Sequence, residues 1–597
     1  MQLLFKLLAI FATFLFIDYL YLHNLENFLQ NQIGIVQELL ILLMIIAILL
    51  FIKNRKIKIV LLILFLAIYY LIFSTQILSL HITGDLINIA TVANAGQFML
   101  LLNGTMILNI LLLVVLFFII YRLSYSILDA KFLNIFIAIL LIIGIYAKLI
   151  NYKHSFEKVS TLMPLKGFYK TMKEFYALKK RKISKLSKYD IDVAKTFNIK
   201  IDSTKKKPFE KECIYKNTLP FETTNSIKKP NIIIFFVESL SARLLAPYNK
   251  QMKDVTPTIQ DFANNSMVVK GYYNHATPTA PALYGQNCSL YPILRYDDFN
   301  TETNPLKHLK LNCMASYFKK ADYKTIYLTH SRDTYSHIKE NLHIWGYEKV
   351  YLWKNLLKEL LPKDKDIILG ETGLSDHQMT RALVNYLKQN KNNKPFFLGI
   401  STIESHVSFE PNSVDGVKYK DGSSNTLNMI YNFDDAFKSF WSYFKNSKYA
   451  KNTIVILTGD HALYPNIDYK RVAGRDWIPS VYDKLSLIIY DPTHKLPKEY
   501  KTNSSSVDLA PTLIHLANLP KKDKNSFLGT SIFDKKEYNN SFGISAYPDF
   551  KFYFDKNGTL INTKLKYLKK DDKIKKEYNA LKNMMNYTYY LQNVGRF

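Results

Sequence analysis

The sequence predicts a protein of two parts: an N-terminal transmembrane domain of five helices, then an extracytoplasmic α/β domain with a mainly parallel sheet. Five long apolar runs occupy the first 150 of the 597 residues. From Asn231 onward, short apolar runs alternate with stretches of helical character. Lys and Arg lie in alternate loops between the long apolar runs, a distribution that indicates which side of the membrane the α/β domain occupies.

Each long apolar run is close to the ~20 residues that a helix needs to cross a bilayer core. A soluble domain would not contain five successive helices that are apolar all round, and a cleaved signal peptide would account only for the first run. The predicted spans are Leu7–Leu22, Ile33–Ile52, Ile59–Leu78, Thr105–Tyr121 and Phe132–Ile150.

The loops between these spans predict the orientation. The loop after the second span, "KNRKIK" (Lys53–Lys58), is strongly basic, and the loop after the fourth carries Arg122 and Lys131. The loops after the first and third spans contain neither Lys nor Arg. Because cytoplasmic loops are enriched in these residues, we expect a multi-pass membrane protein with everything after Ile150 on the outer side.

The net charge of +29 fits either a nucleic-acid binder or a protein that works beside anionic lipid. The predicted topology favours the second class, since the basic residues of the large domain lie outside the membrane and form no recognised nucleic-acid module. We therefore expect a membrane partner and no nucleic acid.

Three cysteines allow one disulfide at most, and the expected pair is Cys288 and Cys313, although sequence alone does not establish connectivity. The expected organisation is a transmembrane domain over 1–151, a basic amphipathic linker over 152–230, a catalytic domain over 231–547 and a C-terminal extension over 548–597.

The α/β domain is predicted from short apolar runs rich in β-branched and aromatic residues, which are typical of strands buried on both faces. Helical stretches such as "NCMASYFKKA" and "DHQMTRALVNYLKQN" lie between them, and this alternation favours a doubly wound sheet. The runs are "NIIIFFV", "YKTIYLT", "KPFFLGIST", "NTIVILTGD" and "LSLIIYD".

Chemically active side chains follow two of these strands. Glu238 comes just after the first strand, and Asp460 and His461 come just after the "TIVILTG" strand. Ligands of doubly wound domains bind beyond the carboxyl ends of the strands. Two carboxylates and an imidazole at one sheet edge suit a single divalent cation with mixed O/N ligands, such as Mn²⁺ or Zn²⁺.

Glu238, the Thr279 segment, "STIESHVSFEP" (Ser401–Pro411), "LTGDH" and "SSVDLAPTLIHL" occur in an order that resembles the sulfatase/alkaline-phosphatase-like superfamily. The resemblance is strongest to its membrane-bound branch of lipoteichoic acid synthases, phosphoglycerol transferases and lipid A phosphoethanolamine transferases. It implies an alkaline-phosphatase-like fold, and a metal held by Glu238, Asp460, His461 and the nucleophile itself.

The nucleophile expected from the resemblance is Thr279. A sulfatase of this superfamily has a C/S-x-P-x-R pattern, whereas this chain has Thr279, retains Pro281 and replaces the Arg with Leu283. Threonine cannot yield the formylglycine aldehyde of sulfatases, but it is the nucleophile of the resembling transferases. Thr277 is the competing hydroxyl; Thr279 alone fits both the Pro281 spacing and the interval to "CSLYP".

The resemblance also implies the substrate contacts. His406 matches a substrate-contacting histidine that could act as general acid, and His330 and Arg332 lie where the family contacts the head group; a turn histidine is the plain alternative for His406. Arg471 and Arg475 could bind phosphate or form a solvated basic loop.

The implied reaction transfers phosphoglycerol from a membrane phospholipid to an envelope glycan or lipid acceptor, through a phosphothreonine intermediate. Phosphoethanolamine transfer is the alternative, less favoured because Ala462–Trp477 lacks the histidine that such enzymes carry there. A sulfatase-like phosphodiesterase and a non-catalytic, membrane-anchored binding protein remain open.

Overall fold

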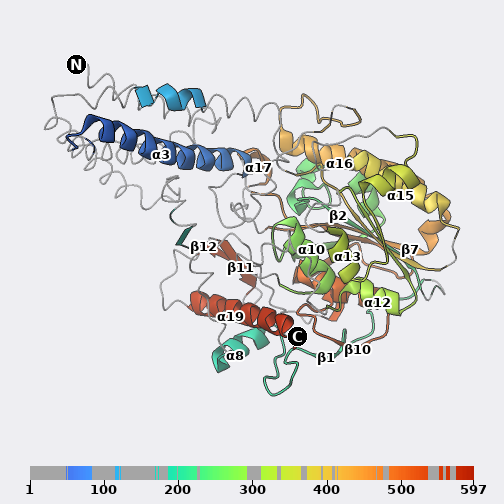
Figure 1. Ribbon diagram of the computed structural model, residues 1–597. Coiled ribbons are helices and arrows are strands. Elements are labelled where there is room, and N and C mark those ends of the chain that lie inside the picture. The colour runs from blue at the N-terminus through green and yellow to red at the C-terminus, as the bar shows by residue number, and fades with distance from the viewer. Residues whose placement is uncertain are drawn as a thin grey trace. The chain divides into compact units, whose positions relative to one another are not determined.

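The computed structural model describes Leu49, residues 52–83, 114–119, 121–122, 169, 172–173 and 186–597 (Figure 1). The last range has gaps at 198, 225–226, 228, 292–310, 332–337, 365–372, 392–393, 407–410, 413, 465–466, 475–482, 535–549, 555–559 and 565–572. The chain divides into two compact units, Met1–Ala177 and Leu178–Phe597.

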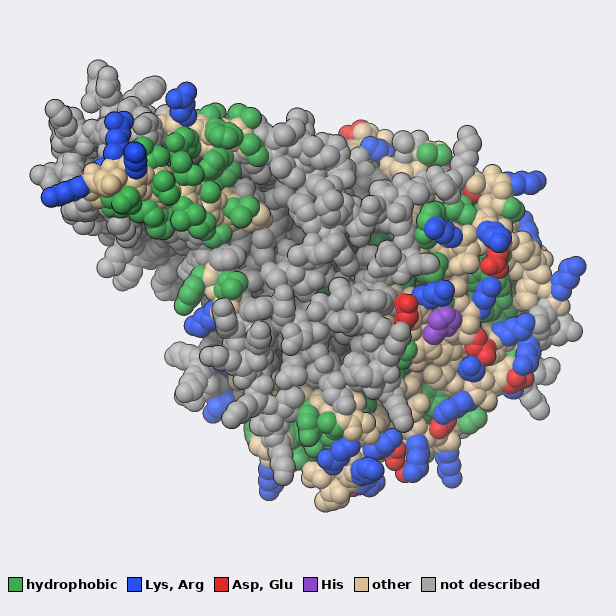
Figure 2. Space-filling view, viewed as in Figure 1, with side chains coloured by type: hydrophobic (Ala, Val, Ile, Leu, Met, Phe, Trp, Pro, Cys, Tyr) green, Lys and Arg blue, Asp and Glu red, His purple; other side chains and the backbone are tan. Residues whose placement is uncertain are grey.

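In the first unit, helix α3 (Arg55–Thr83) contains one segment long and apolar enough to cross a membrane, Arg55–Phe73, and it covers most of the third predicted span. Asn54 caps the helix by accepting hydrogen bonds from the Lys56 and Ile57 amides. Figure 2 shows apolar side chains along this helix and basic side chains at one end of it. The first and fifth predicted spans, and most of the second and fourth, lie outside the described residues.

The α3 helix has two different faces. Leu62, Leu66 and Phe73 are buried within the unit, whereas Val60 and Leu71 are more than 60% exposed. The Tyr70 ring packs against Phe117 of the fourth predicted span, with ring centroids 5.3 Å apart. A helix surface that faces lipid must be apolar, and the exposed face of α3 has this character.

An eight-stranded sheet forms the centre of the second unit, in the order β5-β4-β6-β2-β7-β8-β3-β9. Strands β5, β4, β6, β2 and β7 are parallel to one another, and β9 is parallel to β3. The strands are β2 (Asn231–Val237), β3 (Met267–Tyr273), β4 (Lys324–Thr329), β5 (Lys349–Tyr351), β6 (Phe396–Ser401), β7 (Thr453–Gly459), β8 (Leu487–Tyr490) and β9 (Glu499–Ser505).

The prediction of a mainly parallel sheet is confirmed, and all five predicted strands are present. One of them, β8, runs antiparallel to both β7 and β3. Strands β3, β5 and β9 were not predicted. Lys270 and Gly271 interrupt the apolar run of β3, and β9 is a polar strand at the sheet edge. Neither strand therefore has the continuous apolar sequence that is typical of a central strand.

Helices cover both faces of the sheet, which explains why the central strands are apolar throughout. Alternate residues of β2 enter different cores: Ile232 and Ile234 enter one, Ile233 and Phe235 the other. The first core includes helices α10 (Thr279–Cys288), α12 (Met314–Lys320), α13 (Ile338–Ile344) and α18 (Leu509–Leu516). The second includes α9 (Pro257–Asn264), α15 (Asp376–Gln389), α16 (Asn425–Phe444) and α17 (Ile467–Val472).

Segments on either side of the predicted catalytic domain pack into the same unit. Strand β1 (Lys211–Cys213) pairs antiparallel with β10 (Lys522–Asn525). Helix α8 (Lys188–Thr196) contacts α19 (Lys573–Asn593), where the Asn583 amide donates to Asp190 at 3.2 Å. The remaining elements are α14 (Trp353–Asn355), a short π-helix (Leu356–Leu360), the hairpin β11 (Phe550–Phe554) and β12 (Leu560–Lys564), and 3₁₀ helices at Ala242–Leu244, Lys250–Met252, Lys448–Lys451, Ser506–Asp508 and Ile532–Asp534.

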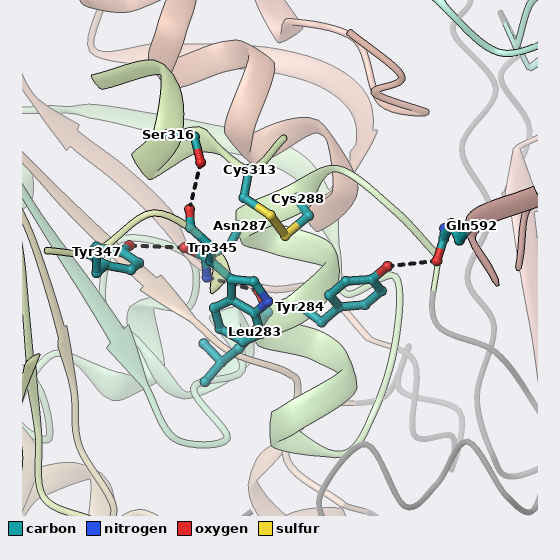
Figure 3. The surroundings of a disulfide bond; sticks show 9 residues. All are labelled: Leu283, Tyr284, Asn287, Cys288, Cys313, Ser316, Trp345, Tyr347 and Gln592. Atoms are coloured by element: carbon teal, nitrogen blue, oxygen red, sulfur yellow. Dashed lines mark hydrogen bonds between the residues drawn. A yellow bond between two sulfur atoms is a disulfide. The ribbon is translucent and has the colours of Figure 1, made fainter. Parts of the chain in front are cut away.

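Helix α10 is attached to its surroundings by covalent and polar bonds (Figure 3). The predicted disulfide between Cys288 and Cys313 is confirmed, and it joins the end of α10 to the start of α12. The Tyr284 hydroxyl donates to the Gln592 side chain of α19 at 3.0 Å. The helix that carries Thr279 is thus bonded to neighbours that are distant in sequence.

Candidate active site

Four adjacent parallel strands end at one edge of the sheet and present the candidate residues there. In spatial order β4, β6, β2 and β7, these strands are followed by His330, by His406, by Glu238, and by Asp460 with His461. Carboxyl ends of parallel strands share one sheet edge. The structure therefore gathers side chains that are up to 223 residues apart in the chain, counting from Glu238 to His461.

Glu238, Asp460 and His461 form a buried cluster whose ligand atoms all lie within 4.8 Å of one another. His461 Nε2 is 3.4 Å from Glu238 Oε1 and 3.6 Å from Asp460 Oδ2. His461 Nδ1 lies 2.8 Å from the Ala462 carbonyl and must donate its proton there, so Nε2 carries the lone pair in the neutral ring.

The two carboxylates are oriented by short local bonds. Asp460 Oδ1 accepts from the backbone amides of Ser239 and His461, at 2.8 and 2.6 Å. Asp460 Oδ2 is buried and has no hydrogen-bond partner within the described part of the chain. The Ser239 hydroxyl donates to Glu238 Oε1 at 2.7 Å.

The electrostatics of the cluster favour a bound cation. Burial, followed by the negative charge of Glu238, raises the pKa of Asp460 to about 7. Burial acts against ionisation of Glu238 as well, but His461, His406 and the hydroxyl donors lower its pKa overall. A divalent ion would neutralise the repulsion between the carboxylates and occupy the orphaned Asp460 oxygen. The residues present therefore fit a divalent metal ion with oxygen and nitrogen ligands.

Thr279 is the first residue of α10, and its hydroxyl points at this cluster. Its Oγ1 donates to Glu238 Oε2 at 3.1 Å and lies 3.5 Å from His461 Nε2. Thr279 is half-buried, whereas Thr277 is only 1% exposed. Leu283, at the position of the sulfatase Arg, is buried in the apolar core beneath the helix. Of the two hydroxyls, Thr279 therefore has the geometry and the access that a nucleophile needs.

Of the two histidines beyond the cluster, His330 is buried and His406 is half-buried. Burial lowers the pKa of His406, and the nearby His461 lowers it further, while Glu238 opposes the shift. Burial also lowers the pKa of His330 to about 4, and its Nε2 lies 3.2 Å from the Ser331 hydroxyl. Arg332 and Arg475 lie outside the described residues, and Arg471 lies in α17.

A buried acid pair with no distinctive sequence pattern supports the loop before His406. Asp376 Oδ1 accepts from the Ile403 and Glu404 amides, and Glu404 accepts from the Asp376 amide at 2.7 Å. Asn412 and Asn432 side chains also donate to Glu404. Burial and the Glu404 charge raise the pKa of Asp376 well above its usual range. Asp376 follows a helix-capping serine, and in sequence it looks like an ordinary first-turn acid.

Residues 230–519 match the family described as Sulfatase. These residues form a sulfatase-family domain. It contains the whole cluster described above, together with Thr279 and both histidines. Members of the sulfatase/alkaline-phosphatase superfamily depend on metal ions, and the Glu238, Asp460 and His461 cluster is the possible metal site of this domain.

Among curated relatives, a lipoteichoic acid synthase of Staphylococcus aureus (strain bovine RF122 / ET3-1) is 24% identical over 397 residues. The match covers 60% of this chain and 57% of the relative, so the chain spans little more than half of the relative's length.

Two solved structures share the fold of the sulfatase-family domain. The lipoteichoic acid synthase LtaP from Listeria monocytogenes has 20% sequence identity and a TM-score of 0.52, covering 67% of this chain and 98% of that chain. A protein in the alkaline phosphatase superfamily from Vibrio parahaemolyticus has 16% identity and a TM-score of 0.51, covering 69% of this chain and 98% of that chain. The domain therefore has the alkaline-phosphatase superfamily fold.

Proposed function

We propose that this protein transfers a phosphoglycerol head group from a membrane phospholipid to a cell-envelope acceptor, through a phosphothreonine intermediate on Thr279. The supporting observation is the position of the Thr279 hydroxyl, 3.1 Å from Glu238 and 3.5 Å from His461 in a cluster that fits a divalent metal. A hydroxyl held against metal ligands is the arrangement expected of an activated nucleophile.

Each residue has a separate task in the proposed reaction. Glu238, Asp460, His461 and Thr279 would hold the metal, Mn²⁺ or Zn²⁺. A bound divalent ion lowers the pKa of a neighbouring hydroxyl and polarises a phosphoryl oxygen. Glu238 orients the Thr279 hydroxyl, whose oxygen attacks the phosphorus in line as the bond from phosphorus to the diacylglycerol oxygen breaks.

Burial lowers the pKa of His406, so its ring starts neutral and can relay a proton in each step. In the first step it takes the proton of the Thr279 hydroxyl and passes it to the departing diacylglycerol oxygen. In the second step it takes the proton of the acceptor hydroxyl and passes it to the Thr279 oxygen. That hydroxyl attacks the phosphothreonine, which releases Thr279 and joins the head group to the acceptor. His330 and Arg332 are proposed to contact the head group.

The phosphoglycerol assignment rests on two observations. The curated relatives matched by the chain bear the name lipoteichoic acid synthase, and no histidine occurs in Ala462–Trp477. Phosphoethanolamine transfer to lipid A or an envelope glycan is the second candidate, because the nucleophile and metal cluster would serve it equally. A phosphodiesterase would use the same first step and pass the phosphoryl group to water.

The proposed location follows from the apolar runs and the basic loops. We place the protein in the bacterial cytoplasmic membrane with five spans, the sulfatase-family domain outside, and the extension after residue 547 beside it. A membrane-embedded anchor would hold the nucleophile near its lipid donor.

Mass spectrometry of the full-length protein tests this proposal. Wild type, Thr279→Ala and Thr277→Ala are incubated with Mn²⁺ or Zn²⁺ and vesicles of phosphatidylglycerol or phosphatidylethanolamine. We expect a glycerophosphoryl adduct on Thr279, and release of diacylglycerol, with phosphatidylglycerol. The adduct should be absent from Thr279→Ala and retained in Thr277→Ala, since Thr277 is almost completely buried.

Other outcomes distinguish the alternatives. A phosphoethanolamine adduct would replace the donor assignment while keeping the mechanism, and free glycerophosphate without transfer to any glycan or lipid acceptor would favour the hydrolase. A protein that binds metal yet forms no adduct and releases no diacylglycerol with either lipid would contradict the proposed function.

A further inference from the structure

Gln286 joins the helix that carries the nucleophile to the loop that carries two of the proposed metal ligands. It lies seven residues after Thr279, on the same face of α10, and its side chain is completely buried. Its amide nitrogen donates to the Gly459 carbonyl at 2.9 Å and to the Asp460 carbonyl at 3.0 Å. Gly459 is the last residue of β7, and Asp460 joins this strand to His461.

The chemistry of the two partners determines which way the amide points. Both are carbonyl oxygens, which only accept hydrogen bonds, so the Gln286 nitrogen must be the atom that faces them. The Gln286 oxygen is buried and has no hydrogen-bond partner within the described part of the chain. Leaving a buried acceptor unpaired costs free energy, so general stability alone is a poor explanation for glutamine at this position.

The Asp460 carbonyl lies in the peptide unit that joins Asp460 to His461, so a bond to it restrains the backbone of both proposed ligands. The Asp460 amide donates to the Val237 carbonyl of β2 at 3.1 Å, one residue before Glu238. The peptide unit before Asp460 is therefore held by both β2 and α10, and the peptide unit after it is held by α10.

We propose that Gln286 is a positioning residue: it sets the spacing between the Asp460–His461 pair and the Thr279 hydroxyl and so prepares the cluster for its metal. The inference rests on the proposed function, because that function gives the cluster its metal. Residues that orient metal ligands typically change metal affinity or activity by roughly 10- to 100-fold when they are replaced.

The neighbouring residue provides a matched control. Asn287 is also a fully buried carboxamide of α10, but it donates to the Leu283 carbonyl of its own helix at 2.8 Å and accepts from the Tyr347 hydroxyl at 2.9 Å (Figure 3). Neither partner belongs to the metal cluster. Removing Asn287 therefore removes a buried amide from the same helix without releasing the Asp460 turn.

The test compares Gln286→Met with Asn287→Leu in the full-length protein in detergent. Each substitution is close in size and removes the amide. Calorimetric titration with Mn²⁺, repeated with Zn²⁺, measures the Kd, and thermal unfolding without metal measures stability. We expect Gln286→Met to raise the Mn²⁺ Kd by roughly 10- to 100-fold. Asn287→Leu should leave the Kd within about two-fold of wild type, although both variants lower the melting temperature of the metal-free protein.

A wild-type Kd in Gln286→Met would overturn the inference, as would equal loss of affinity in both variants, because that would indicate a general loss of structure. If Gln286→Met does not fold, Gln286→Asn takes its place: it keeps a polar amide but withdraws it by one methylene, beyond the reach of the carbonyls. The readout needs no lipid substrate. Failure of adduct formation in a metal-binding wild type would therefore contradict the proposed function and leave this inference standing.

Discussion

At the scale of single residues, a buried carboxylate of the sulfatase-family domain completes the start of helix α9. Thr256 at the start of α9 makes no side-chain capping bond. Instead Asp434, from the middle of α16, accepts from the Thr258 and Ile259 amides at 3.0 and 2.8 Å. A carboxylate supplied from another helix thus satisfies amides that the helix start leaves unpaired.

This arrangement predicts a pH dependence of stability. Burial raises the pKa of Asp434 from 3.8 to about 6. Between pH 4 and pH 6 the folded chain therefore binds more protons than the unfolded chain, so this group's stabilising contribution is complete below pH 4 and is lost as the pH rises through 6. The loss is about 3 kcal/mol.

Asparagine does not titrate, so Asp434→Asn does not lose this contribution as the pH rises. The free energy of unfolding of Asp434→Asn, relative to that of wild type, should therefore increase by about 3 kcal/mol between pH 4 and pH 7. Denaturant unfolding followed by tryptophan fluorescence measures this, since all four tryptophans lie after residue 344. Parallel stability curves for wild type and variant across this pH range would contradict the assignment.

At the scale of secondary-structure elements, helix α10 packs closely against the segment that precedes it. Its residues from Pro281 to Cys288 are all buried, and Gly285 sits directly against His275. A Cβ at position 285 would lie 1.7 Å from His275 Nε2 and 2.5 Å from the Leu290 carbonyl oxygen. His275 in turn is held by Ser506, whose hydroxyl lies 2.6 Å from His275 Nδ1. The glycine therefore sets how closely the nucleophile helix approaches the segment before it.

Gly285→Ala should destabilise the protein even though alanine favours helix by about 1 kcal/mol over glycine. Overpacking against His275 and a backbone carbonyl is expected to cost about 1–3 kcal/mol beyond that gain. Thermal unfolding checks the direction. In a His275→Ala background the cost of Gly285→Ala should shrink, because one of the two clashing groups is gone. An undiminished cost there, or a stabilised single variant, would contradict this packing argument.

At the scale of the whole molecule, the two compact units are suited to different surroundings. The first exposes large apolar side chains along α3, including Ile57, Leu64 and Ile68. The second encloses two apolar cores and the entire candidate site. A unit with its own cores and its own site should fold without the other.

We expect a fragment of residues 178–597 to fold and to bind metal. At Mn²⁺ concentrations 100 times the Kd, binding should stabilise it by about 2.7 kcal/mol, and removal of the ion with EDTA should lower its melting temperature accordingly. Asp460→Asn serves as the control, because it keeps a similar shape and loses a charged ligand. A fragment whose melting temperature is the same with metal and with EDTA would contradict the metal assignment.

Much of the site was predictable from sequence because it depends on local patterns. The apolar runs ending at Glu238 and Asp460 predicted two parallel strands whose ends meet, and the structure brings these residues within 4.8 Å together with His461. The Cys288–Cys313 pairing was also predicted and is confirmed. The antiparallel direction of β8 was not predicted. An apolar run indicates that a strand is buried, but it does not indicate whether the strand is parallel or antiparallel to its neighbours.

By itself, the sequence determined which segments are apolar, which strands lie at the centre of the sheet and which polar residues follow them. These properties depend on residues adjacent in the chain. Only the tertiary structure decided that Asp376 supports the Ile403–Glu404 backbone and that Gln286 holds the Asp460 turn. Glutamine on a helix and aspartate in a first turn are ordinary in any sequence. Their roles arise from hydrogen bonds to backbone groups far along the chain, and those partners become neighbours only when the sheet and its helices assemble.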